Sequence, residues 1–171
     1  MDAFVNALVA DKPVGRLRDE LDMFGRLVGA WDFRWKWSGA EGNGEWLFSW
    51  ILGGKGIQDV FIWPPRNERE NRILEEGEYG TTIRMYNEWE HHWNIYYSNG
   101  GTGSVGIARP RGDDIVIDME PKEDDAVRVR WMFTAITDTS FRWQNMVSND
   151  AGFSFETRGE LLATRTPANE A

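Results

Sequence analysis

The sequence predicts an all-β protein: an antiparallel up-and-down β-barrel of about ten strands with a short N-terminal helical segment. The spacing of apolar residues changes from helical to alternating at Gly29. Short alternating segments then follow one another at regular intervals, with turn residues and no helical pattern between them. A meander of this many strands removes its exposed edges by closing on itself.

The helical segment is visible in the positions of its apolar residues. Leu17, Leu21 and Phe24 recur at helical spacing with charged residues between them. Gly29 ends this pattern, as glycine commonly does just past a helix.

The strands are predicted from alternation. Trp31, Phe33, Trp35 and Trp37 alternate with charged residues, which is typical of a half-buried strand. Residues 66–78 are highly charged and form the longest predicted loop. Further strands are expected near 46–50, 57–63, 79–86, 89–97, 103–109, 114–120, 126–136, 139–147 and 153–164.

The chain length of 171 residues fits a single domain. We expect one domain over 1–171, comprising a helical part, a barrel and a frayed tail at 1–28, 29–165 and 166–171 respectively.

Composition excludes several classes of function. With 28 acidic and 19 basic residues the net charge is −9, which argues against a nucleic-acid partner. The chain has no cysteine and no phosphate-binding or dinucleotide-binding glycine motif, so we expect neither a metal site nor a cofactor. No signal peptide and no long apolar run is present, which predicts a cytoplasmic protein without a membrane partner.

The 10 Trp, 9 Phe and 4 Tyr residues are the most unusual feature of the composition. At any one position such a ring serves as core filling, whereas so many together favour a pocket lined with rings. This predicts a small hydrophobic or aromatic ligand. The proposed wall consists of Trp35, Trp37, Phe61, Trp93, Tyr96, Tyr97, Trp131 and Trp143.

Two adjacent histidines, His91 and His92, are candidates for acid–base chemistry near neutral pH. Neighbouring strand residues point to opposite faces, so at most one of them faces the interior. The face that carries His91 also carries Trp93 and Tyr97 and is the more apolar, so we expect it to point inward. Alternatively, both histidines have ordinary packing or surface roles.

Three charged residues interrupt apolar strands. Asp59, Arg84 and Arg130 each lie in mid-strand between apolar neighbours. They are either outward-facing charges or an interior polar cluster that orients a ligand, because an unpaired buried charge is costly.

A family resemblance adds to these patterns. The helical segment leads into Gly29-Ala30-Trp31, which resembles the Gly-x-Trp signature of lipocalins and the wider calycin group. The resemblance implies that Trp31 closes one end of the barrel and that a late arginine, Arg165 or else Arg158, packs across it. The strand count is closer to ten-stranded intracellular calycins such as fatty-acid-binding proteins and nitrobindins. The pattern is also similar to small bacterial lipocalin-like proteins.

These observations leave three functions open. The first is a cofactor-independent enzyme, of isomerase, cyclase, decarboxylase or lyase type, acting on a small aromatic or polyketide-like molecule; the enzymes of the resembling barrels suggest it by analogy. The second is a carrier or sensor for a small hydrophobic ligand. The third is a haem protein of nitrobindin type with a histidine ligand. A homodimer is also predicted, because Leu47 and Ile51 make the strand around Trp46 apolar on both faces.

Overall fold

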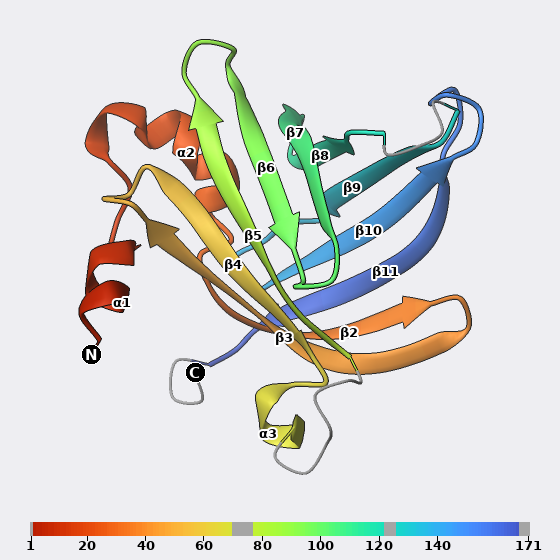
Figure 1. Cartoon of the computed structure of the whole chain (residues 1–171), viewed down its shortest axis with the longest axis horizontal. Coiled ribbons are helices and arrows are strands. Elements are labelled where there is room, and N and C mark those ends of the chain that lie inside the picture. Colours follow the sequence, from red (N-terminus) through yellow and green to blue (C-terminus); the bar gives the residue numbers. More distant parts are fainter. Residues whose placement is uncertain (1, 70–76, 122–125, 168–171) are drawn as a thin grey trace.

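Within the described residues, ten antiparallel strands close into a barrel in the computed structural model (Figure 1). The structure describes residues 2–69, 77–121 and 126–167. Each strand pairs with the next along the chain, and the last strand pairs with the first, which closes the sheet. The barrel strands are β2 (Gly29–Trp37), β3 (Ala40–Ile51), β4 (Gly56–Trp63), β5 (Glu78–Asn87), β6 (His92–Ser98), β7 (Gly103–Arg111), β8 (Asp114–Met119), β9 (Arg128–Thr134), β10 (Ser140–Ser148) and β11 (Glu156–Arg165). The predicted fold class is confirmed.

The N-terminal segment contains the predicted helices and one additional short strand. Its elements are α1 (Ala3–Leu8), β1 (Val9–Ala10), a 3-10 helix (Gly15–Leu17) and α2 (Arg18–Gly25). The strand β1 pairs with the end of β3, Val9 opposite Ile51. Helix α2 buries Leu21 and Phe24 completely, so its apolar face packs into the barrel core beside β4 and β5 (Figure 1).

Because consecutive strands run in opposite directions, successive hairpin turns lie at opposite ends of the barrel. Since β2 starts beside α2 and runs away from it, the turns alternate between the α2 end and the opposite end. The turns after β3, β5, β7 and β9 lie at the α2 end, which we call the closed end. The connections after β2, β4, β6, β8 and β10 lie at the other end, which we call the open end.

The closed end is fastened by Trp31 and Arg165. The Trp31 side chain is fully buried, and its indole N–H donates to the Leu27 carbonyl at 2.8 Å. The Arg165 guanidinium carbon lies 4.0 Å from the Trp31 ring centre, a cation–π contact. Arg165 also donates to the carbonyls of Val28 and Arg26. The lipocalin-like contact expected between Trp31 and Arg165 is thus present.

Gly29, four residues after the end of α2 at Gly25, is needed where β2 begins. Its φ is +131°, a conformation that other residues rarely adopt. A Cβ at this position would meet the Arg165 Nη1 atom at 2.5 Å. Glycine is therefore required both by the backbone turn and by the close approach of Arg165.

The predicted 66–78 loop and the predicted 166–171 tail each lie only partly within the described residues, and part of each is more regular than expected. The 66–78 loop begins with a short helix, α3 (Arg66–Arg69), and Glu78 already belongs to β5, while 70–76 lie outside the described residues. In the predicted tail, the Thr166 N–H donates to the Ala30 carbonyl at 2.9 Å, so this residue continues the β2–β11 seam. Residues 168–171 lie outside the described residues.

Candidate functional site

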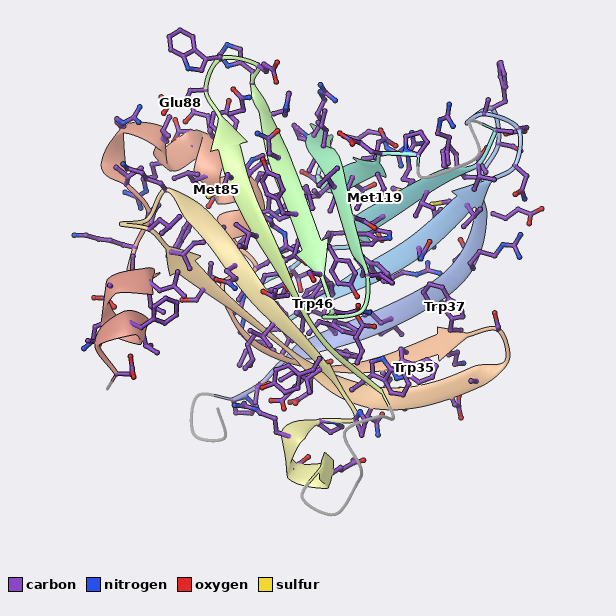
Figure 2. The ribbon with its side chains drawn as sticks, in the orientation of Figure 1. Trp35, Trp37, Trp46, Met85, Glu88 and Met119 are labelled. Carbon is purple, nitrogen blue, oxygen red and sulfur yellow. The ribbon has the colours of Figure 1, made fainter. Side chains whose placement is uncertain are left out.

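A cavity of about 500 Å³ lies inside the barrel toward the open end. Residues of eight strands line it, because β2, β3, β4, β5, β6, β9, β10 and β11 converge around the barrel interior. Figure 2 shows Trp35 and Trp37 along β2 and Trp46 near the middle of the molecule. The lining residues are Trp35, Trp37, Ala40, Trp46, Phe61, Trp63, Glu78, Thr82, Arg84, Tyr97, Trp131, Phe133, Trp143, Asn145, Glu160 and Leu161.

The aromatic wall contains two groups of contacting rings. The Trp35 and Trp63 ring centres are 4.9 Å apart on one side of the cavity. On the other side Trp131 lies 5.8 Å from Trp143 and 5.4 Å from Tyr97, the latter edge-to-face. Such contacts hold the rings in fixed orientations, so the wall presents preformed aromatic faces and edges.

An ion pair buried in the barrel lies at the cavity wall. Arg84 on β5 and Asp59 on β4 are joined by a 2.5 Å contact between Nη2 and Oδ2, with side chains 2% and 0% exposed. Asp59 Oδ1 also accepts a hydrogen bond from the Thr82 backbone N–H at 3.0 Å. The Arg84 guanidinium packs against the rings of Phe24 and Phe48, which lie toward the closed end. These contacts fix the ion pair between the core and the cavity.

The ionisation of Asp59 is set by two opposing effects. Burial raises the pKa of its carboxyl group, and the adjacent Arg84 guanidinium and the hydrogen bond from Thr82 lower it. The burial effect is the larger, so the pKa lies above its ordinary value. The ion pair therefore places a carboxyl group that binds a proton more readily than usual in the interior.

Glu78 and Tyr97 form a second polar pair at the cavity wall. The Tyr97 hydroxyl donates a short hydrogen bond to Glu78 Oε1, linking β6 to β5. Burial, followed by the hydrogen bond and charge of Glu78, raises the pKa of the Tyr97 hydroxyl well above its usual range. The phenol therefore stays protonated and directed at Glu78 near neutral pH.

Several buried polar atoms of the wall have no hydrogen-bond partner among the described residues. They are Nε1 of Trp35, Trp46 and Trp131, Nε of Arg84 and Oδ1 of Asn145. Buried polar groups in folded proteins are normally satisfied, so a group of unsatisfied atoms around one cavity requires an explanation.

The histidines lie at the other end of the barrel. Of the described residues, the cavity wall includes neither His91 nor His92, and both instead line a separate hollow beside α2. His91 is exposed in the β5–β6 turn with φ of +52°, and β6 begins only at His92. The expected inward orientation of His91 is wrong because this turn interrupts the alternation that Trp93 and Tyr97 follow. His92 is 5% exposed, and its Nε2 lies 3.0 Å from Asn94 Oδ1.

Three further predicted site residues lie away from the cavity. Arg130 pairs with Asp118 on the neighbouring strand, Nε to Oδ1 at 2.7 Å, since its neighbour Trp131 takes the inward position. Trp93 is buried in the closed-end core, edge-to-face with Phe24 at 5.0 Å. Tyr96 is 47% exposed on the outer face of β6. The other predicted wall residues, Trp35, Trp37, Phe61, Tyr97, Trp131 and Trp143, line the cavity together with Asp59's partner Arg84.

Sequence reasoning missed several wall residues. Trp46 was visible as an alternating aromatic but was not assigned to the wall. Glu78 was hidden because the charged stretch before it reads as a loop, although it shares the inward face of β5 with Thr82 and Arg84. Asn145 gave a usable signal, as a polar residue two positions after Trp143 on one strand face.

Together the closed barrel, the Trp31–Arg165 contact and the interior cavity define a lipocalin-like barrel fold. Among solved structures, the chain is similar to the S-type phycobiliprotein lyase CPES from Guillardia theta. The TM-score is 0.53 at 14% identity, and the match covers 86% of this chain and 92% of the lyase chain. At this identity the likeness concerns the fold. A scan against protein-family models finds no match, and neither does a search of the curated proteins.

Two further observations concern the described residues alone. None of their helices is long and apolar enough to cross a membrane. They also contain no group of three or more histidine, cysteine or acidic side chains that is placed to hold a metal ion.

Proposed function

We propose that this protein binds a small, flat aromatic molecule in the cavity at the open end of the barrel. The observation that carries the proposal is the aromatic wall, in which six Trp, Phe or Tyr side chains expected from the sequence converge with Trp46 and Trp63 around about 500 Å³. This volume falls within the range of about 300–1,000 Å³ typical of small-molecule sites.

The energetics of the wall support a planar ligand. A ligand that covers apolar surface of the cavity removes this surface from water. The binding free energy becomes more favourable by about 25 cal/mol per Å² covered. Offset-stacked or edge-to-face ring pairs add about 0.5–1.5 kcal/mol each. Because Trp131 is already held in place by Trp143 and Tyr97, ordering this part of the wall on binding would cost little free energy.

A second candidate is a cofactor-independent enzyme of lyase, isomerase, cyclase or decarboxylase type acting on the same kind of molecule. Glu78 and Tyr97 favour it, since a carboxylate and a phenol at a cavity wall can move a proton. Asp59 and Arg84 would position the substrate. The geometry favours this pair over His91 and His92 as acid and base. The similar solved structure is named as a lyase, which agrees with this class.

The haem alternative has less support. A haem of nitrobindin type needs a histidine ligand within its pocket, and His91 and His92 line the hollow beside α2 instead. A homodimer, a cytoplasmic location, and the absence of nucleic-acid and membrane partners stay predictions. Of the two residues from which the dimer was predicted, Leu47 and Ile51, the second is 2% exposed and pairs with Val9 of β1 within the monomer.

Ligand retention tests the proposal directly. Native and denaturing mass spectrometry of the purified protein should reveal a bound small aromatic molecule. Replacing Trp131 by Leu should weaken its binding by between about twofold and about tenfold, as one lost ring contact implies. The matched control is Trp89→Leu, because Trp89 is 94% exposed in the β5–β6 turn at the closed end. Equal losses in the two variants would contradict a site in this cavity.

A further inference from the structure

The polar atoms of the cavity wall contain more information about the ligand than the rings do. Four of the five unsatisfied atoms are N–H donors, on Trp35, Trp46, Trp131 and Arg84, and Asn145 offers the one acceptor among them. Arg84 is 2% exposed, so its Nε–H has no ready access to bulk solvent. Leaving a buried donor unpaired costs free energy that a ligand acceptor would recover. The wall is therefore matched to oxygen acceptors.

The charges at the wall distinguish between kinds of oxygen. The positive charge of Arg84 is already neutralised by Asp59 at 2.5 Å. A ligand carboxylate would lose its hydration on entering, and it would meet an ion pair rather than a free cation. The carboxylate of Glu78 also faces the cavity and repels an anion. A neutral oxygen incurs neither cost.

The Tyr97 hydroxyl does not compete for the ligand oxygen. It donates to Glu78, so its proton is directed at the protein. The unsatisfied Arg84 Nε–H and the indole N–H groups of the wall, including that of Trp131, are the donors left for a ligand.

We propose that the cavity selects a neutral, flat, conjugated carbonyl compound, such as an aromatic ketone, quinone or lactam, whose oxygen accepts a hydrogen bond from Arg84 Nε with Trp131 Nε1 as a second donor. A carboxylate on the same ring system is disfavoured. This inference rests on the proposed binding function and adds the chemical class of its ligand.

A set of three compounds with one ring skeleton tests the inference. Fluorenone carries a carbonyl, fluorene carries none, and fluorenecarboxylate carries an anion. Titration calorimetry or quenching of tryptophan fluorescence would give the dissociation constants at neutral pH. We expect fluorenone to bind about tenfold more tightly than fluorene, and fluorenecarboxylate to bind most weakly.

Arg84→Lys identifies the donor, because lysine keeps the positive charge beside Asp59 and lacks the Nε–H of arginine. The preference for fluorenone over fluorene, taken as the ratio of their dissociation constants within the variant, should fall about tenfold. The matched control is Arg130→Lys, the same substitution in an Arg–Asp pair outside the cavity. It should leave both affinities as they are. If Arg84→Lys does not fold, Trp131→Phe keeps a ring and removes an N–H, and it should reduce the same preference.

The outcomes separate the two proposals. Fluorene or fluorenecarboxylate binding as tightly as fluorenone would overturn the carbonyl inference and leave the aromatic-binding function in place. An unchanged preference in both Arg84→Lys and Trp131→Phe would overturn the assignment of the donors. Saturable binding by none of the three compounds would contradict the binding function itself.

Discussion

The closed end and the open end of the barrel differ in how the N–H groups of their side chains are satisfied. At the closed end the Trp31 indole donates to the Leu27 carbonyl, and Arg165 donates to backbone carbonyls. Toward the open end Trp131 and Arg84 keep buried N–H groups without partners among the described residues. The same residue types thus serve stability where their polar atoms are paired and serve recognition where they are left for a ligand.

The largest expected effect concerns Trp31. Replacing Trp31 by Ala should lower the free energy of unfolding by about 3–5 kcal/mol, the range for a large buried aromatic, because both its packing and its contact with Arg165 are lost. Urea denaturation followed by circular dichroism measures the change. A loss below about 1 kcal/mol would remove the distinction between the two ends.

The buried ion pair should give the next largest effect. Arg84→Met leaves Asp59 without its cation and should cost about 3 kcal/mol at neutral pH, whereas Arg84→Met combined with Asp59→Leu should recover most of the loss. Equilibrium unfolding of both variants provides the comparison. Equal destabilisation of the two would show that the lost packing of Arg84, rather than the stranded carboxylate, is responsible.

The pH dependence of Arg84→Met has a definite sign. Burial raises the pKa of Asp59 in the folded protein, and loss of Arg84 raises it further. A carboxyl group with a raised folded-state pKa contributes stability that is present below its unfolded-state pKa and is lost as pH rises through the folded-state pKa. The deficit of Arg84→Met relative to wild type should therefore shrink on acidification. A deficit that grows as pH falls would contradict this assignment.

A smaller effect is expected for Trp131. Trp131→Ala should cost about 1–2 kcal/mol, which is below the loss for Trp31→Ala, because this ring is partly exposed and already borders a cavity. Its main consequence should be weaker ligand binding. Thermal melts with and without ligand separate the two effects, and a loss as large as that of Trp31→Ala would make Trp131 a core residue.

The smallest effect concerns the open-end turn between β10 and β11. Hydrogen bonds from Ser148 and Ser154 lower the pKa of Asp150 to about 2. Stability from a lowered carboxyl pKa is present above the unfolded-state value and is lost as pH falls through the folded-state value. Asp150→Asn should therefore melt slightly below wild type near pH 6, and the difference should vanish near pH 2. A difference independent of pH would rule out the charge of Asp150 as its cause.

The fold was predictable from the sequence because alternation is a local signal. The run from Trp31 to Trp37 shows which residues share a strand face, and Gly29 shows where the helical period ends. The inward set of β6 was likewise visible in Trp93 and Tyr97.

Parts of the site were not predictable because they depend on where a strand starts and which strands are neighbours. In the sequence, His91 has the same spacing as the inward residues of β6. In the structure, His91 lies in the β5–β6 turn with a positive φ, so it precedes the strand and does not share its alternation. Asp59 and Arg84 are 25 positions apart in the sequence, and only the β4–β5 register brings them together. Without that register, Arg84 and Arg130 look alike, although one is inside the barrel and the other is paired on its surface.

The seam between β2 and β11 also has a kinetic consequence. Arg165 reaches the Val28 carbonyl across 137 positions of the chain, and the Trp31 position pairs with Arg165 itself. Contacts between such distant segments carry a high loop-closure entropy and slow folding. Ribosomal synthesis proceeds from the N-terminus, so one edge of β2 stays unpaired until β11, the last strand, has been synthesised. We therefore expect closure of this seam to be the late, rate-limiting event of folding. A circular permutant that links the C-terminal end to the N-terminal end, so that β11 precedes α2 and β2 in the chain, should fold faster than the natural order.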